Sequence, residues 1–340
     1  MVSNTAAWLK NGKSGIVVDS APYSPPAENE IVIKTRAVAV SFVDWATQAL
    51  DMFPLQYPTA FGSDVSGEIF EVGSAITHLK KGDRVLAHAP FAMGNYVSTQ
   101  GAFQQYVVCL PQLTSIIPDT ISFEQAATMP LAVTTAAAGL FEMENLGLNY
   151  PSLDSESTGK SLLIWGGASS VGCNAIQLAT AAGYEVITTS SQKNFELMKK
   201  LGAVQVFDYN NSTIVRDLVT ALENKAIVGA FEASGKPEGV LGCAEVLLKT
   251  GGGKFIAAVQ RLPEGIPEGI IAKFYLATTI KESGIGKHIY NNFLPNALAQ
   301  GNYIPVPMPK VVGSGFEHLQ TALDAIPERS VSAQKLVVSL

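Results

Sequence analysis

Residues 162–194 read LLIWGGASSVGCNAIQLATAAGYEVITTSSQKN, and this stretch predicts how the middle of the chain folds. An apolar run leads into a short glycine-rich turn, an amphipathic run follows, and a second apolar run begins after Gly183. Strand, helix and strand in this order form a right-handed crossover in a parallel sheet. Because the alternation continues from about residue 126 to about residue 280, we expect a doubly wound parallel sheet there.

The residues on either side of this segment follow a different pattern. Before about residue 125, short apolar runs such as EIVIKTRAVAV and AFQQYVVCL alternate with Gly, Pro and Asp turns. After about residue 285, NYIPVPMPKVVGSG and QKLVVSL are β-like again. We therefore expect an α/β protein with a β-rich domain at 1–125, a parallel-sheet domain at 126–280 and a return to the first domain at 281–340. Such a return would create a cleft between the two domains.

Composition and charge exclude several classes of protein. With 340 residues, 47% of them apolar and 15% charged, the chain is typical of globular enzymes and unlike disordered proteins. A net charge of −6 opposes nonspecific binding to nucleic acid or to an anionic membrane. Residues 126–141, AATMPLAVTTAAAGLF, are fewer than the roughly 20 that span a membrane, and they predict a single buried helix instead.

Cysteine use and the first residues favour a cytoplasmic location. Cys109, Cys173 and Cys243 are far apart and form no C-x-x-C pair, which disfavours a disulfide scaffold or a zinc ribbon. The stretch MVSNTAAWLKNGKSG has a lysine where a signal peptide needs its apolar core. We expect a cytoplasmic protein in a reducing compartment.

The glycine-rich turn has the frame of a dinucleotide-binding loop. Residues 167–172, GASSVG, fit the pattern G-x-G-x-x-G with Ser169 at the middle glycine. We expect Gly167 to allow the tight turn, Gly172 to allow close packing of the helix on the sheet, and the helix N-terminus to bind a pyrophosphate. The alternative is an ordinary tight turn between a strand and a helix.

The residue that would select NAD is absent. In an NAD site an acidic residue about 20 residues after the turn binds the ribose hydroxyls. Here Ser190, Ser191 and Lys193 stand at that point, and the next strand ends at Asp208 and Tyr209. Hydroxyl groups and an ammonium suit a 2′-phosphate, which a carboxylate would repel. The sequence therefore predicts NADPH as the cofactor; a solvent-exposed loop lysine is the alternative for Lys193.

Ordered motifs over essentially the whole chain resemble the medium-chain dehydrogenase/reductase superfamily. PTAFGSDVSGEIFEVG, KKGDRV and GAFQQYVV resemble its GroES-like catalytic domain, MPLAVTTAAAGL resembles its linker helix, and the segment from GGASSVG to VFDY resembles its Rossmann nucleotide-binding core. The most similar branches are the zinc-free quinone oxidoreductases and the fungal trans-acting enoyl reductases, which are often labelled zinc-binding dehydrogenases. The resemblance implies a GroES-like domain combined with a Rossmann domain.

The resemblance also implies which residues contact the cofactor. The positions that face the pyrophosphate are matched by Ala168, Ser169, Ser170 and Val171. The positions that face the 2′-phosphate are matched by Ser191, Lys193 and Tyr209, and those near the nicotinamide by Val259 and Gln260. Arg329 matches an arginine that some quinone reductases place on the cofactor. An arginine on a surface helix is the alternative at that position.

The label "zinc-binding" does not suit the residues. The resemblance implies that zinc-dependent members bind a catalytic metal with a cysteine and a histidine–glutamate pair, and a structural zinc with four clustered cysteines. The matching positions here are Ser41 and the pair Ser63 and Asp64, and residues 88–101 contain no cysteine. Because serine hydroxyls are poor zinc ligands, we predict a zinc-independent enzyme without a metal site.

Five residues are candidates for the substrate pocket: Ser41, Asp44, Trp45, Ser63 and His88. The enoyl reductase branch often reads V-D-W-K where this chain reads V-D-W-A, so Ala46 replaces a lysine that would touch cofactor or substrate. Packing in the domain core is the alternative for Trp45. No catalytic residue is assigned. Neither a Ser-His-Asp order nor a pair of carboxylates stands out, so the sequence gives no support to hydrolysis.

These features predict an oxidoreductase that acts on a small molecule. Without a metal to stabilise an alkoxide, we expect NADPH-dependent hydride transfer to the β-carbon of an α,β-unsaturated carbonyl, with hydrogen bonds to the enolate. Reduction of a quinone or a reactive aldehyde is one alternative, and NADPH binding without redox turnover is another. Family members commonly form homodimers through edge strands of the cofactor domain, and GGGKFIAAV near Gly253 is the candidate edge.

Overall fold

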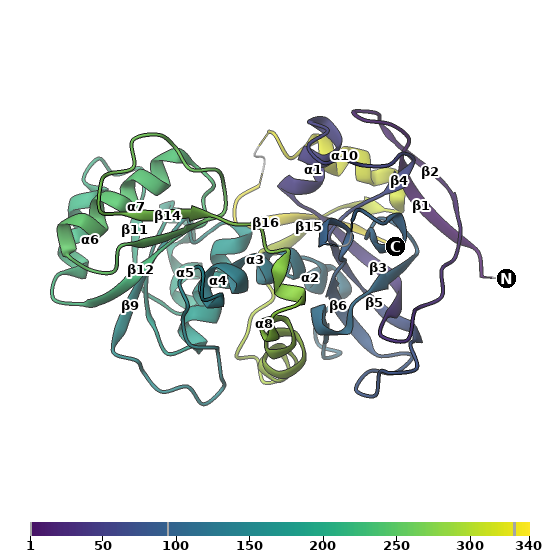
Figure 1. Cartoon of the computed structure of the whole chain (residues 1–340), viewed down its shortest axis with the longest axis horizontal. Helices are drawn as coiled ribbons and strands as arrows, with labels where there is room; N and C mark the ends of the chain where they lie inside the picture. The colour runs from purple at the N-terminus through teal and green to yellow at the C-terminus, as the bar shows by residue number, and fades with distance from the viewer. Residues whose placement is uncertain (1, 94, 329–330) are drawn as a thin grey trace. The chain divides into compact units, whose positions relative to one another are not determined.

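The computed structural model describes residues 2–93, 95–328 and 331–340. The chain forms two compact units: unit 1 consists of Met1–Leu131 and Gly286–Leu340, and unit 2 of Ala132–Ile285 (Figure 1). The sequence placed the corresponding boundaries near residues 125 and 280. A β-rich unit and a parallel-sheet unit are both present, so the predicted α/β fold class is confirmed.

Unit 1 is built on two mainly antiparallel sheets. Within its described residues the larger sheet has the strand order β15-β16-β3-β5-β6-β8, and β7 also pairs with β3. These strands are β3 (Ile31–Val40), β5 (Asp64–Val72), β6 (Arg84–His88), β7 (Tyr106–Cys109), β8 (Thr114–Ile116), β15 (Met308–Ser314) and β16 (Gln334–Ser339). The smaller sheet has the order β2-β1-β4, with β1 (Asn4–Leu9), β2 (Ile16–Ala21) and β4 (Thr59–Ala60).

Apolar side chains determine the register of the larger sheet. Ile33, Val38 and Val65 are fully buried in one core cluster, where Phe61 and Phe103 form an edge-to-face contact with ring centroids 5.0 Å apart. A slip of one residue would turn every buried side chain of a strand to the other face. The ends of β3, β5 and β6 therefore occupy well-defined positions.

Short helices complete unit 1, and one helical run differs from the prediction. They are α1 (Phe42–Ala49), α2 (Phe123–Ala127), α8 (Gly284–Lys287), the π-helix η6 (His288–Phe293), α9 (Leu294–Ala299), α10 (Leu319–Asp324) and the 3-10 turns η1 (Phe91–Met93), η2 (Ser98–Gln100), η3 (Pro111–Leu113) and η7 (Phe316–His318). The two β-like stretches expected after residue 285 contain β15 and β16, but the helical run at 286–299 was not predicted. Buried Ile289, Tyr290, Phe293, Leu294 and Ala297 recur there at helical spacing.

Unit 2 is a doubly wound parallel sheet, as the sequence predicted. The strand order is β11-β10-β9-β12-β13-β14, with all pairs parallel. The strands are β9 (Lys160–Trp165), β10 (Glu185–Ser190), β11 (Ala203–Asp208), β12 (Ala226–Glu232), β13 (Phe255–Ala258) and β14 (Ile271–Phe274). The helices are α3 (Pro130–Phe141), α4 (Ser170–Ala181), α5 (Phe195–Lys200), α6 (Ile214–Leu222) and α7 (Pro237–Thr250), with 3-10 turns η4 (Gln192–Asn194) and η5 (Thr279–Lys281).

The apolar run at residues 126–141 forms two helices, so the prediction of one helix is wrong. α2 ends at Ala127 and α3 begins at Pro130. Proline has no N–H to donate and disfavours helical geometry in the residue before it. Thr128 caps the end of α2 with a backbone N–H and a hydroxyl that donates to Gln125 O at 2.8 Å.

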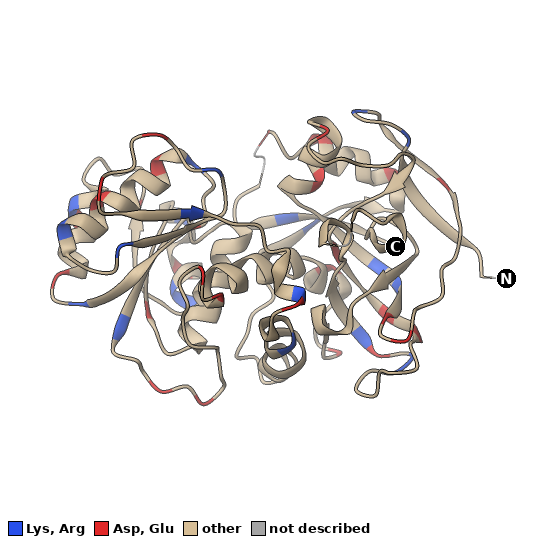
Figure 2. Cartoon of the chain, in the orientation of Figure 1, with Lys and Arg blue, Asp and Glu red and all other residues tan. Residues whose placement is uncertain are grey.

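The candidate dimer edge also needs correction. β13, which contains most of GGGKFIAAV, pairs with β12 on one side and with β14 on the other, so it is an internal strand. β14 ends the described strand order, and its Ile271 is 63% exposed. Acidic and basic residues are interspersed along both units (Figure 2). Among the described residues no helix is long and apolar enough to cross a membrane.

Candidate functional site

The glycine-rich turn joins β9 to α4 in unit 2, and its tight bend falls at Gly166. Gly166 has φ +86°, a conformation that side-chain-bearing residues rarely adopt, and a Cβ there would lie 2.7 Å from Ser234 N. The assignment of the tight bend to Gly167 is therefore wrong by one residue. A Cβ at Gly172 would lie 2.3 Å from Gly166 O, so the expected close packing at Gly172 is confirmed.

Ser169 has a specific task in this turn. It is the N-cap of α4, and its Oγ accepts a hydrogen bond from Gly172 N at 2.9 Å. The four predicted pyrophosphate contacts, Ala168, Ser169, Ser170 and Val171, are half-buried, so the N-terminus of this 12-residue helix is open to solvent. Backbone N–H groups at such a terminus suit an anion.

The predicted 2′-phosphate residues follow two neighbouring strands. β10 ends at Ser190 and β11 at Asp208, and these two residues are partners in the register of the strands. Ser191 is half-buried, Lys193 is exposed in η4, and Tyr209 is 42% exposed just after β11. Because carboxyl ends of parallel strands meet at one edge, these groups lie at the same edge of the sheet.

Ser190 is placed differently from its neighbours. It is fully buried, and its hydroxyl donates to Ser191 O at 3.1 Å. Asn194, which the sequence did not single out, donates from Nδ2 to Ser191 Oγ at 3.2 Å and so orients that hydroxyl. Ser191 thus presents its hydroxyl nearer the surface than Ser190 does.

Two carboxylates bear on cofactor choice. Glu185 lies at the opposite end of β10 and pairs with Lys225 at 2.5 Å, far from the carboxyl edge. Asp208 lies at the carboxyl edge beside Ser190, and its Oδ1 accepts from Asn210 N at 2.9 Å and from Asn210 Nδ2 at 2.8 Å. These hydrogen bonds within its own turn partly compensate the negative charge of Asp208. Because a carboxylate at this edge would repel a 2′-phosphate, Asp208 is the strongest local argument against that group.

Val259 and Gln260 follow β13 and pack near the loop after β12. Val259 N donates to Glu232 O at 3.2 Å, and a Cβ at Gly235 would lie 2.9 Å from Gln260 Cδ. Glu232, fully buried at the end of β12, accepts from Ser234 N at 2.8 Å, Gly235 N at 3.2 Å and Ser234 Oγ. Burial raises the pKa of Glu232.

Glu232 was missed at the sequence level, although a signal existed. An acidic residue ends the apolar run IVGAFE and is followed by the loop ASGK. Its carboxylate organises that loop by accepting hydrogen bonds from the backbone. Arg329, the remaining predicted cofactor contact, lies outside the described residues.

The substrate-pocket candidates form a buried polar cluster in unit 1. Ser41 precedes α1, Asp44 lies in its first turn, Ser63 precedes β5, and His88 ends β6 opposite Asp64 in the strand register. The sequence also marked Asp64, but it did not single out Lys335 of β16, which joins the cluster. Lysine near the start of a strand is ordinarily solvated, so sequence offered no signal for its burial.

Asp64 is the centre of the cluster and is fully buried. Its Oδ2 accepts from Lys335 Nζ at 2.7 Å and from Ser41 Oγ at 2.9 Å, and its Oδ1 accepts from Leu131 N at 2.7 Å. Charge-assisted hydrogen bonds of this length are among the strong ones in proteins. Asp64 is therefore hydrogen-bonded by partners from three segments of unit 1.

Asp44 and His88 respond to burial in opposite directions. Asp44 accepts from Ser41 N at 2.7 Å and from Ser63 Oγ at 3.4 Å. Burial, followed by the nearby Asp64 carboxylate, raises the pKa of Asp44 to about 7. Burial, with a smaller effect of the Lys335 ammonium, lowers the pKa of His88 to about 4, so His88 is neutral at pH 7.

Trp45 and Ala46 lie on α1 beside this cluster. Trp45 is half-buried, packs against the core of unit 1 and contacts the Phe42 ring at a centroid distance of 5.3 Å. This supports the alternative that Trp45 packs in the core. Ala46 is fully buried, so the position of the branch's lysine is occupied by a packed methyl group.

The cluster does not fit a zinc ion. Zinc prefers thiolate, imidazole and carboxylate ligands, whereas Ser41 and Ser63 offer hydroxyls and Asp64 is already bonded to an ammonium. Across the residues that the structure describes, no group of three or more His, Cys, Asp or Glu side chains could hold a metal. No step of a reaction is therefore assigned to a metal here.

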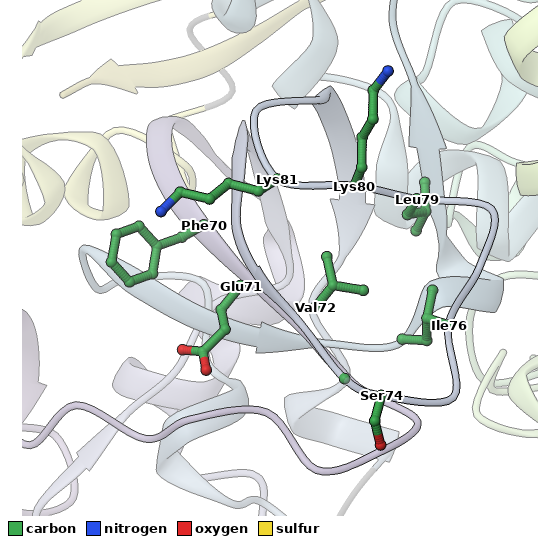
Figure 3. A pocket seen from close by; sticks show the side chains of 9 residues that line it. Phe70, Glu71, Val72, Ser74, Ile76, Leu79, Lys80 and Lys81 are labelled. Carbon is green, nitrogen blue, oxygen red and sulfur yellow. The ribbon is translucent and has the colours of Figure 1, made fainter.

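A separate hollow of about 630 Å³ lies at the other end of β5. Figure 3 shows Phe70, Glu71 and Val72 on one side and Lys80 and Lys81 on the other, with Lys81 Nζ 5.1 Å from the centre of the Phe70 ring. Eight residues of strand separate Asp64 from Val72, or roughly 26 Å at 3.3 Å per residue. The hollow therefore does not belong to the polar cluster.

Comparisons with known proteins agree with this architecture. The family described as "Alcohol dehydrogenase GroES-like domain" matches residues 27–119, and the family described as "Zinc-binding dehydrogenase" matches residues 170–293. The dehydrogenase azaJ of Aspergillus niger is 45% identical over the full length of both chains. The trans-enoyl reductase himH of Aspergillus japonicus is 37% identical over 99% of this chain and 97% of its own.

Solved structures share the fold at lower identity. The CurK enoyl reductase superposes with a TM-score of 0.75 at 20% identity, covering 99% of each chain. The Escherichia coli quinone oxidoreductase, solved with NADPH, gives a TM-score of 0.71 at 20% identity over all of both chains. With two family models matched and relatives at 37–45% identity along the whole chain, this protein is an oxidoreductase that belongs to the medium-chain dehydrogenase/reductase superfamily, in its zinc-free enoyl-reductase-like branch.

Proposed function

We propose that the protein is an NADPH-dependent reductase of activated C=C bonds in α,β-unsaturated carbonyl compounds. The observation that carries this proposal is the composition of the unit 1 cluster, in which hydroxyls and an ammonium surround Asp64. This donor set provides no Lewis acid for an alkoxide, whereas conjugate reduction requires only hydrogen bonds to an enolate. The relatives named trans-enoyl reductase support the same reaction class.

The carboxyl edge of the unit 2 sheet provides groups that suit NADPH. Ala168, Ser169, Ser170 and Val171 would hold the pyrophosphate at the α4 N-terminus, where an added Cβ at Gly166 or Gly172 would collide with backbone. When bound, the nicotinamide would supply the hydride. The loops after β12 and β13, braced by Glu232, would position Val259 and Gln260 at its reactive end.

The 2′-phosphate would lie among Ser191, Lys193 and Tyr209. Lys193 is exposed, and within the described chain its ammonium has no ion-pair partner. Phosphate would therefore gain a cation without breaking an existing pair. Asp208 opposes this choice, but its hydrogen bonds to Asn210 reduce the effect of its charge on a neighbouring ligand.

Reduction of a quinone or a reactive aldehyde is the second candidate. The shared fold with a quinone oxidoreductase solved with NADPH favours it, although that likeness shows the fold alone. All these substrates accept hydride at an electron-poor carbon or ring position, so one cofactor site would serve each of them.

A substrate panel tests the proposal. The purified protein is mixed with NADPH and, separately, with an aryl enone, an enoyl thioester, a benzoquinone and an aldehyde, and absorbance of the reduced nicotinamide is followed. We expect consumption with the enone or the thioester, and transfer of deuterium from 4-deuterated NADPH to the β-carbon. Consumption with quinone or aldehyde alone would overturn the C=C assignment. Cofactor binding without any consumption would favour a protein that binds NADPH without turnover.

A further inference from the structure

The hollow of about 630 Å³ in unit 1 lies between the end of β5 and the loop that leads to β6 (Figure 3). Its volume is within the roughly 300–1,000 Å³ of small-molecule pockets. Val72, Ile76 and Leu79 provide an apolar floor, and Phe70 and Lys81 stand at its edge. None of the residues assigned above to cofactor or substrate lines it, so the hollow is a separate feature of unit 1.

The loop that carries Lys81 is held against β5 by its backbone. Ile69 N donates to Asp83 O at 2.9 Å, and Gly82 N donates to Ile69 O at 2.8 Å. The Asp83 carboxylate accepts from Lys80 N at 2.9 Å, so it is engaged within the turn. Because this turn is fixed, the Lys81 side chain starts from a defined position, and a ligand would not have to order the loop.

The turn after β5 fixes the apolar floor in the same way. Ile76 N donates to Gly73 O at 3.1 Å, and a Cβ at Gly73 would lie 2.1 Å from Ala27 O. The turn therefore packs directly on the backbone of a neighbouring segment. Leu79 is buried and anchors the floor in the core of unit 1, whereas Val72 and Ile76 are half-buried and keep apolar surface open to a ligand.

Three aromatic rings form the edge next to Lys81. Phe70 contacts Tyr106 at a centroid distance of 4.8 Å and Tyr23 at 5.9 Å, and the two tyrosine rings are 5.6 Å apart. The Tyr23 hydroxyl donates to the Glu71 carboxylate, which compensates part of that negative charge. Lys81 Nζ lies 5.1 Å from the centre of the Phe70 ring, within the range of a cation–π contact, so the ammonium is held beside the hollow.

Among the described residues Lys81 has no carboxylate partner, in contrast to a similar lysine elsewhere in unit 1. Lys10 Nζ lies 5.6 Å from the centre of the Trp8 ring, but it also lies 3.8 Å from Asp19 Oδ2. For Lys81, residues 2–93, 95–328 and 331–340 provide no ion pair. In Figure 3 the Lys81 side chain extends along the hollow, whereas the Lys80 ammonium points away from it. One uncompensated positive charge therefore stands beside an apolar floor.

We propose that this hollow binds a small organic acid, whose carboxylate pairs with Lys81 and whose apolar tail packs on Val72 and Ile76. The anion would gain a cation that has no ion pair to break, and the tail would remove apolar surface from water. Nine residues line the hollow, far fewer than the roughly 20–30 on each side of a protein interface, so the occupant is a free acid rather than a protein. The inference does not rest on the reaction proposed above.

Methyl NMR gives a local readout of binding. Protein labelled with carbon-13 at Ile, Leu and Val methyl groups is titrated with 4-phenylbutyrate and, separately, with 4-phenylbutanol, which has the same ring and chain without the charge. We expect the Ile76 and Val72 signals to shift to saturation with the acid. The alcohol should bind about fivefold more weakly, because it cannot form the ion pair with an exposed ammonium.

Substitution of neighbouring lysines separates a directed contact from general charge. Lys81→Met should weaken binding of the acid about fivefold and leave binding of the alcohol unchanged, because only the ion pair is lost. Lys80→Met removes the same charge one residue earlier and should change the affinity less than about twofold, because that ammonium points away and is screened by salt. Lys10→Met, at a lysine already paired with Asp19, is the distant control and should leave binding unchanged.

A substitution of opposite sign sharpens the test. Glu71→Gln removes a negative charge from the lining of the hollow, so it should strengthen binding of the acid about twofold at low salt. Binding of the alcohol should stay the same. Weaker binding of the acid by Glu71→Gln would contradict the proposed recognition of an anion.

Three further outcomes would overturn the proposal. The first is that neither the Ile76 nor the Val72 signal of the parent approaches saturation below about 10 mM acid. The second is equal affinity for acid and alcohol, or for the parent and Lys81→Met, because the charge would then not be recognised. The third is an equal loss for Lys80→Met and Lys81→Met, because general attraction would then explain the binding. Since Lys81 is exposed, its variant should fold normally, and unchanged methyl signals in unit 2 verify this.

Discussion

Lys193 and Lys335 carry the same ammonium group in opposite surroundings. Lys193 is exposed at the carboxyl edge of the unit 2 sheet, and in the described part of the chain no residue is paired with its charge. Lys335 is 4% exposed and donates to Asp64 and to Thr128 O. An exposed ammonium is available to a ligand, whereas a buried one is already used in folding. Substitutions in the two regions should therefore change different measurements: binding at the open edge, stability in the buried cluster.

The buried cluster should show the largest effect, through the titration of Asp44. Its carboxyl has an ordinary pKa of 3.8 and a pKa of about 7 in the folded protein, because of burial and of Asp64. Between these values the folded state binds more protons than the unfolded state, so stability falls as pH rises from about 4 to about 7 and then levels off. The pKa difference corresponds to roughly 4 kcal/mol.

Asp44→Asn should remove this pH dependence, since an amide resembles the protonated acid. Denaturant unfolding of parent and variant from pH 4 to 8 gives a difference curve, and we expect the variant to gain relative to the parent as pH rises. Asp119→Asn, at a side chain that is 95% exposed, serves as the control. A difference curve that is flat for Asp44→Asn would contradict the assigned ionisation.

The second-largest effect is expected for a substitution in the glycine-rich turn at the carboxyl edge of the unit 2 sheet. Gly166→Ala requires a strained backbone at φ +86° and a Cβ only 2.7 Å from Ser234 N, so we expect a loss of about 2–4 kcal/mol in unfolding free energy. Gly159→Ala has φ +66° but nothing within 4 Å of the new Cβ, and should cost only about 1 kcal/mol. Thermal unfolding of both variants checks this. Equal losses of unfolding free energy would show that the strain at positive φ accounts for the whole effect and that the contact with Ser234 adds nothing.

Cofactor selection at the same edge is tested with Lys193→Ala. A charge-assisted hydrogen bond is typically worth about 1.5–3 kcal/mol, so NADPH binding should weaken by roughly tenfold to a hundredfold while NADH binding stays nearly unchanged. Lys200→Ala, at an exposed lysine ending α5, is the control. Calorimetric binding constants for both cofactors decide the matter. A parent that prefers NADH would show that Asp208, rather than Lys193, governs this end of the site.

The smallest expected effect concerns assembly. We propose a homodimer through β14, where Ile271 is 63% exposed at the end of the described strand order. Ile271→Lys should weaken such a dimer by about tenfold, because a charge on an edge strand opposes pairing. Val204→Lys, on the opposite edge strand β11 and 54% exposed, should leave the association unchanged. Sedimentation across a concentration series measures both, and a monomeric parent at micromolar concentration would remove the proposal.

Sequence reasoning succeeded where the signal is local. The run from 162 to 194 predicted strand, helix and strand, and β9, α4 and β10 lie there. Errors arose where neighbouring residues were read without their backbone geometry: the bend fell on Gly166, and Pro130 divided a run expected to be one helix. The helical run at 286–299 was not predicted, although its buried apolar residues recur at helical spacing.

The sequence by itself determined the parallel-sheet unit, the glycine turn and the absence of thiolate and imidazole at Ser41 and Ser63, because each depends on residues adjacent in the chain or on residue chemistry alone. Only the tertiary structure decided that Asp64 meets Lys335, 271 positions away. It also decided that Ser190 is buried while Ser191 is not, and that β13 is internal while β14 forms the edge. The physical reason is that charge pairing and burial depend on which strands become neighbours, and strand order is set by packing of the whole unit rather than by local sequence.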